Sequence, residues 1–154
     1  MKFMPLLFLP LFAFSKNISV FEGEYIHRHS LYVVSENKTF HNIQDIVKIQ
    51  PVNDHTANIL VESYTQNFHS CQLVGQAELK DEALIFKSPI NKKLNRGKAA
   101  TCKLKITVTQ DTTTGEKTAK VEDVGDYCRL RYCGMSAELT GLYNQKTVVI
   151  EDKK

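Results

Sequence analysis

The sequence predicts an all-β protein: a single small antiparallel β-barrel or sandwich that is stapled by two disulfides. Short runs of alternating apolar and polar residues are typical of half-buried strands, and turn-forming residues separate them about every ten positions. No window of about eleven residues holds the apolar repeat of a helix. The chain has four cysteines, an even number that suits two disulfides in an exported protein. Its 154 residues fit one domain.

The first fifteen residues have the order of a secretory signal peptide. Lys2 is followed by an uncharged apolar run from Phe3 to Phe14, and the small residues Ala13 and Ser15 precede a cut before Lys16. This run of about 12 residues is too short to cross a bilayer, which needs about 20. We therefore expect a signal peptide at 1–15, a single domain at 16–154, no transmembrane segment after the signal is removed, and a periplasmic or secreted location.

The charge balance excludes one class of partner. The full chain carries a formal charge of +3, and Lys2 is the only charged residue of the leader, so the remaining chain is close to neutral. Proteins that bind nucleic acid usually show a strong basic excess. We therefore expect no nucleic-acid partner.

The clearest strand runs from Thr101 to Thr109. Cys102 and every second residue after it are apolar, whereas the residues between them are Lys or Thr. A turn-rich stretch follows, and a second strand is expected over Lys117–Val124. If the chain folds back at Thr114–Gly115, Val108 lies opposite Val121.

The same register suggests how the cysteines pair. It places Cys102 one position short of Cys128, and a single-residue bulge near Gly125 would bring the two together. We therefore favour Cys102–Cys128 and, with it, Cys71–Cys133, although spacing alone allows three connectivities. With all four cysteines paired, no thiolate nucleophile remains.

A second hairpin precedes the first. A turn at Asp81–Glu82 pairs Leu79 with Leu84 and places Ala77 opposite Phe86, with all four side chains on one face. Further strands are expected at Tyr25–Ser35, Asp45–Gln50, Ala57–Thr65, Met135–Tyr143 and Lys146–Ile150.

The connection from Ser88 to Ala100 carries four closely spaced cations: Lys92, Lys93, Arg96 and Lys98. Such a charge run is often only a solvated connector. The alternative is a contact surface for an acidic protein or a phosphate-bearing envelope polymer, because loops on a rigid β scaffold commonly carry binding. We take these four residues as the candidate partner-binding site.

Catalytic, metal and cofactor motifs are weak. His27 and His29 share one face of the strand expected at Tyr25–Ser35, and His41, His55 or His69 could supply a third ligand from elsewhere, but the spacing matches no known closed site. Ser136 lacks the G-x-S-x-G context of a hydrolase nucleophile, and no glycine-rich phosphate loop is present. We therefore expect no metal, no cofactor and no enzymatic activity.

Several segments carry a resemblance to a known group. The run from Asn67 to Ala77, then Cys102-Lys-Leu104, Cys128 and Tyr132-Cys133-Gly134, resembles small exported bacterial proteins with four cysteines and no assigned activity. The resemblance covers about 57–142. In size, export, disulfides and β content the chain also resembles the periplasmic lysozyme inhibitors, an architectural similarity that transfers no functional residue.

These observations lead to one functional expectation and two alternatives. We expect an exported non-enzymatic binding protein whose partner is a protein, with inhibition of, or immunity against, a cell-wall hydrolase as its task. One alternative is a barrel that carries a small apolar ligand in an internal cavity; a filled core would argue against it. The residues expected to fill that core are Leu73, Leu84, Phe86, Leu104 and Ile106. The other alternative is an unrecognised envelope hydrolase.

Overall fold

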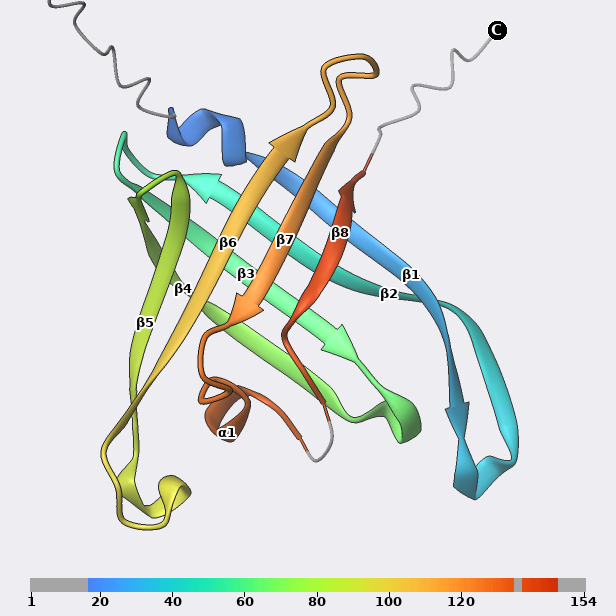
Figure 1. Ribbon diagram of the computed structural model, residues 1–154. Helices are drawn as coiled ribbons and strands as arrows, with labels where there is room; N and C mark the ends of the chain where they lie inside the picture. The colour runs from blue at the N-terminus through green and yellow to red at the C-terminus, as the bar shows by residue number, and fades with distance from the viewer. Residues whose placement is uncertain (1–16, 135–136, 147–154) are drawn as a thin grey trace, which may run out of the picture.

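The computed structural model describes residues 17–134 and 137–146. Eight strands, each antiparallel to its neighbours and in chain order, form a closed barrel (Figure 1), which confirms the predicted fold class. The strands are β1 (Gly23–Val33), β2 (Lys38–Pro51), β3 (Thr56–Tyr64), β4 (Ser70–Lys80), β5 (Ala83–Ile90), β6 (Ala100–Gln110), β7 (Lys117–Asp123) and β8 (Gly141–Gln145).

Most predicted strands are found with shifts of no more than two residues at their ends. Two differ more: β2 begins at Lys38, seven residues before the predicted start at Asp45, and of the strand predicted at Met135–Tyr143 the described residues enter β8 only at Gly141. The predicted signal peptide and most of the strand expected at Lys146–Ile150 lie outside the described residues.

Apolar side chains fill the barrel. Alternate residues of each strand point inward, as the pleat requires, and form one continuous cluster. The five residues predicted to fill the core are all buried in it: Leu73, Leu84, Phe86, Leu104 and Ile106. Close packing of this kind stabilises a small domain by removing apolar surface from water.

Short helical segments cover the two ends of the barrel (Figure 1). At one end, the 3-10 turn η1 (Ile18–Phe21) buries Ile18 and Phe21 against the core. The hydroxyl of Tyr25 donates a hydrogen bond to the Phe21 carbonyl at 3.0 Å, which fixes this turn to β1. At the other end lies α1 (Arg129–Tyr132), an element that the alternation pattern did not predict.

The β6–β7 hairpin has a different register from the predicted one. Val121 pairs with Ile106, and Val108 pairs with Ala119, so the predicted pairing of Val108 with Val121 is wrong by two residues. The cause is the loop, in which the Asp111 carboxylate accepts hydrogen bonds from the amides of Thr113 and Thr114. A two-residue shift preserves which face is buried, so the predicted inward residues are still correct.

The β4–β5 hairpin pairs as predicted only near its turn. Leu79 lies opposite Leu84, but regular pairing ends at Glu78 and Ile85, before the predicted juxtaposition of Ala77 with Phe86. Beyond that point the Phe86 ring lies against Gly75, where a Cβ atom would meet Phe86 Cε2 at 2.3 Å. Gly75 therefore leaves the space that the Phe86 ring fills.

We predict that Gly75→Ala destabilises the protein by about 1–3 kcal/mol, because overpacking forces the Phe86 ring and its neighbours to shift. Urea unfolding measures the change in the free energy of unfolding. Gly134→Ala is the matched control, since its nearest heavy atom would lie at 3.6 Å. Adding Phe86→Leu to Gly75→Ala should recover part of the loss, and equal effects of the two glycine substitutions would contradict the packing argument.

Tyr25 gives a pH prediction. Burial raises its pKa from 10.0 to about 12. The unfolded chain loses this proton near pH 10, whereas the folded protein keeps it until about pH 12, so stability falls over that interval. Urea midpoints measured between pH 9 and pH 12 should fall more steeply for the wild type than for Tyr25→Phe. Identical slopes for the two proteins would rule out this coupling.

Candidate functional site

Both disulfides hold the segment around α1 to the barrel. Cys71 of β4 is bonded to Cys133, and Cys102 of β6 is bonded to Cys128, as predicted. The path of the chain to Cys128 is not the predicted one, which ran along the strand with a bulge near Gly125. Instead the chain leaves the sheet after β7, turns, and reaches Cys128 at the start of α1. The two bridges thus hold the two ends of a short helix against strands β4 and β6.

Polar contacts complete this attachment. Asp123 accepts hydrogen bonds from the amides of Cys128 and Arg129 at 3.1 and 3.2 Å, which satisfies two free donors at the start of α1. Burial raises the pKa of the Asp123 carboxyl, and the two amides partly oppose that change. Arg131 donates to the Ser88 hydroxyl and to the Pro89 carbonyl of β5 at 3.0 and 2.8 Å. The segment is therefore attached to β4, β5 and β6.

The predicted cationic loop lies next to α1. Its 3-10 turn η4 (Lys92–Asn95) is capped by Asn91, whose side chain accepts a hydrogen bond from the Lys93 amide at 3.0 Å. Between this loop and the 125–130 segment is a cleft of about 460 Å³, which we call the basic cleft. It is lined by Leu94, Asn95, Arg96, Lys98, Ala99, Gly125, Asp126, Tyr127, Arg129 and Leu130.

Two of the four predicted loop cations line this cleft. Arg96 and Lys98 do so, whereas Lys92 and Lys93 are exposed on η4 outside the lining set. The opposite wall supplies Arg129, a third cation that the sequence analysis missed. The sequence did contain a signal for Arg129, which directly follows Cys128. A Cys102–Cys128 bond brings Arg129 close to β6, the strand that follows the cationic loop.

The basic cleft also exposes apolar surface. Leu94 is 51% exposed and Tyr127 is 40% exposed. Exposed aromatic and aliphatic side chains among cations are a common composition of protein-binding sites, since the apolar groups supply burial energy and the charges supply orientation.

A second depression lies between β1 and β8. Among the residues that the structure describes, two residue pairs join these strands, Tyr25 with Gln145 and Ile26 with Asn144. Beyond that pair is a depression of about 430 Å³, which we call the polar notch. It is lined by His27, His29, Asp45, Ser63, Tyr64, Thr65, Glu138, Thr140, Gly141, Leu142 and Tyr143.

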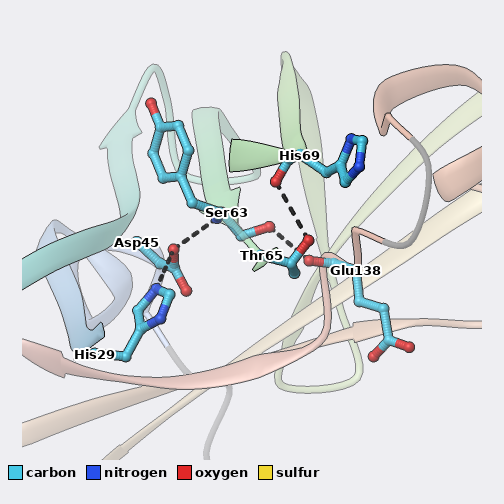
Figure 2. A network of polar contacts seen from close by, with 7 residues as sticks. His29, Asp45, Ser63, Thr65, His69 and Glu138 are labelled. Atoms are coloured by element: carbon cyan, nitrogen blue, oxygen red, sulfur yellow. Dashed lines mark hydrogen bonds and ion pairs between the residues drawn. The ribbon is translucent and has the colours of Figure 1, made fainter. Parts of the chain in front are cut away.

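Asp45 organises one wall of the notch (Figure 2). The buried carboxylate accepts a hydrogen bond from His29 Nε2 at 3.1 Å and another from the Tyr64 amide at 2.8 Å. A neutral His29 that donates from Nε2 keeps Nδ1 as an acceptor. Ser63 fixes the opposite wall, because its hydroxyl donates to the Glu138 carbonyl at 2.5 Å.

Tyr143 lies at the floor of the notch. Its side chain is only 2% exposed, and its ring crosses Gly141, where a Cβ atom would meet the phenol oxygen at 3.3 Å. Burial raises the pKa of Tyr143 above that of an ordinary tyrosine, and the negative charge of Asp45 raises it further. The hydroxyl therefore remains neutral over the physiological range.

The histidines predicted as metal-ligand candidates are only partly brought together. The rings of His27 and His29 stack with centroids 5.5 Å apart, whereas His41 bonds to the Ser30 hydroxyl at 3.0 Å on an exposed part of the hairpin. Within 17–134 and 137–146, no three His, Cys, Asp or Glu side chains are grouped so that they could hold a metal ion.

The basic cleft and the polar notch are linked by a third depression of about 300 Å³. It shares Asp126 and Arg129 with the basic cleft, and Glu138 and Thr140 with the notch. The lining therefore changes from cationic near η4 to acidic near β1.

Comparisons with protein-family models, curated proteins and solved structures give no match for this chain. The two disulfides indicate folding in an oxidising environment outside the cytoplasm. The part of the chain that the structure describes contains no helix of the length and apolar character needed to cross a membrane.

We predict that the Cys71→Ala/Cys133→Ala variant is less stable than the wild type by about 4 kcal/mol, the loop-closure term for a long covalent loop. The separation of 62 residues exceeds the 26 of the other bridge, so Cys102→Ala/Cys128→Ala should cost somewhat less. Urea unfolding measures both, and hydrogen exchange should show faster opening of the α1 amides. A loss below about 1 kcal/mol in both variants would contradict a structural role for the bridges.

Proposed function

We propose that this chain is a non-enzymatic binding protein, exported to the periplasm or secreted, that inhibits a cell-wall hydrolase or gives immunity against one. The observation that carries the proposal is the basic cleft. Three cations, Arg96, Lys98 and Arg129, converge there with exposed Leu94 and Tyr127. Such a surface suits an acidic rim or loop of a protein partner that also offers an apolar contact.

Rigidity supports this role. One wall of the cleft continues directly into β6, and the other contains Cys128 and α1, which the disulfides hold to the barrel. A binding surface that is ordered before it meets its partner loses less conformational entropy on association. The arrangement therefore favours tight binding by a small number of preformed contacts.

The filled interior favours a surface-binding function over the carrier alternative. The inward residues of the barrel form one buried cluster, including Leu73, Leu104 and Ile106. A carrier of an apolar molecule would need that volume for its ligand.

The proposal predicts inhibition of a cell-wall hydrolase by the purified, oxidised protein. Lysozyme and amidase activities on peptidoglycan are the first assays, and a pull-down from envelope extract identifies the partner. The triple variant Arg96→Ala/Lys98→Ala/Arg129→Ala should weaken binding of that partner on the order of tenfold to hundredfold, because the three charges act mainly by complementarity to the partner's surface. The affinity of this variant should also lose its dependence on salt concentration.

The matched control is Lys80→Ala/Lys87→Ala/Lys103→Ala, which removes the same charge from the outward positions of three strands and should leave binding unchanged. Equal loss in the two triple variants would point to net charge rather than to the cleft. The proposed function is rejected if no hydrolase is inhibited or captured. It is also rejected if the cleft binds polyphosphate but no protein.

A further inference from the structure

The β5–β6 hairpin is cationic along its whole length. From Ala83 to Gln110 the sequence contains seven Lys and Arg residues and none of the chain's 17 Asp and Glu residues. The seven cations are Lys87, Lys92, Lys93, Arg96, Lys98, Lys103 and Lys105. They lie on β5, on the 91–99 connection and on β6, and the two strands pair directly with each other. The charge run of the connection is therefore one part of a larger basic surface.

Little of this charge is neutralised within the protein. Among the residues that the structure describes, Lys105 has an acidic partner, the Glu122 carboxylate at 4.0 Å, and the other six cations form no ion pair. Lys87 and Lys103 lie directly opposite each other on the outward face of the neighbouring strands. Like charges at opposite positions of a sheet are unfavourable. An anionic partner would remove this repulsion, so the pair points to a ligand outside the chain.

The opposite end of the barrel has the opposite charge. Because the strands run up and down in chain order, the β2–β3, β4–β5 and β6–β7 connections lie at one end and the β5–β6 connection lies at the other (Figure 1). Those three connections carry acidic residues and neither Lys nor Arg: Asp54, Asp81, Glu82, Asp111 and Glu116. A separation of charge along the barrel orients the molecule in an external field. The β5–β6 end therefore turns toward an extended anionic surface.

The tip of the hairpin combines its charges with an exposed apolar side chain. Leu94 is 51% exposed on η4, and two cations precede it and two follow it within four residues of the chain. The connection that carries Leu94 projects from the end of the barrel past α1 (Figure 1). Basic residues around an exposed apolar side chain are typical of segments that lie in the interface of an anionic membrane.

We propose that the β5–β6 hairpin binds the surface of a lipid bilayer that carries anionic phosphate headgroups. The cations of the hairpin face the headgroups, Leu94 enters the boundary between headgroups and acyl chains, and the acidic end of the barrel points into solution. A soluble polyanion would satisfy the charges but would leave Leu94 in water. A bilayer fits better because it accepts both the charges and the apolar side chain.

This inference goes beyond the proposed inhibition of a hydrolase and does not rest on it. Four of the cations lie outside the lining of the basic cleft: Lys87, Lys92, Lys93 and Lys103. Substitution of these four changes the bilayer-binding surface and leaves the lining of the cleft as it is. Vesicle binding is measured on the purified protein without a hydrolase, so the failure of either proposal leaves the other unaffected.

The test is co-sedimentation of the purified, oxidised protein with large vesicles. One set consists of phosphatidylcholine alone, and the other of phosphatidylcholine and phosphatidylglycerol in equal parts. We expect binding to the mixed vesicles only, and release at high ionic strength, because salt screens exposed charges. The variant Lys87→Gln/Lys92→Gln/Lys93→Gln/Lys103→Gln should lower the affinity on the order of a hundredfold, since each cation near such a surface contributes to binding.

The matched control is Lys48→Gln/Lys80→Gln/Lys117→Gln/Lys146→Gln, which removes the same charge from positions toward the acidic end and should keep most of the wild-type affinity. Urea unfolding checks that the hairpin variant is folded. It should unfold at the wild-type urea concentration or above, because its four lysines form no ion pair with a described residue. Equal losses of affinity in the two quadruple variants would mean that net charge alone decides binding, and would overturn the inference.

A fluorescence measurement tests the insertion of the hairpin tip. The chain contains no tryptophan, so Leu94→Trp places a single indole on η4. Its emission should shift to shorter wavelength with the mixed vesicles and stay unchanged with phosphatidylcholine alone. Binding of inorganic polyphosphate without such a shift on mixed vesicles would assign the hairpin to a soluble polyanion and overturn the bilayer proposal. Equal sedimentation with the two kinds of vesicle, or none with either, would also overturn it.

Discussion

The attachment of the α1 segment is the constraint on which the rest of this structure depends. A helix of four residues has almost no stability of its own, because nucleation costs more than one turn returns. Here Cys128 and Cys133 bind its two ends covalently to β6 and β4, and Arg131 binds it to β5. The segment covers the barrel at the place where β4 and β5 separate. Beyond α1, the Gly134 amide donates a 2.8 Å hydrogen bond to the Ser70 carbonyl and so attaches the chain to β4 again.

Both candidate binding sites follow from this attachment. The basic cleft forms because the segment lies beside the 92–98 loop. The polar notch forms because the chain beyond the segment enters β8 only at Gly141, so that Glu138 and Thr140 lie outside the sheet beside His27 and His29 of β1. The Ser63 hydroxyl holds the Glu138 carbonyl and so fixes the approach to β8. One covalent arrangement thereby orders two surfaces of opposite charge around one end of the barrel.

The filled interior directs function to that end. Inward positions are apolar through most of the barrel, but the layer nearest the notch replaces them with His29, Asp45 and Ser63. A buried carboxylate is tolerated there because it accepts two hydrogen bonds, one of them from the Tyr64 backbone. The apolar layers therefore stabilise the barrel, whereas the layer of hydrogen-bonded polar side chains at the notch forms a surface that is suited to recognition.

The sequence by itself determined the all-β class and the buried faces, because alternation is a local property. It favoured the pairing of Cys102 with Cys128, but from a hairpin register that is wrong by two residues, and the cysteine spacing alone left three connectivities open. The hairpin register required the hydrogen bonds of Asp111, which alternation cannot reveal, since a two-residue slip leaves the same faces buried. Loop cations such as Arg96 were visible as a charge run, but their convergence with Arg129 was not. The polar notch depended wholly on tertiary structure, because Asp45 and Tyr143 are far apart in the chain and meet only when the barrel closes.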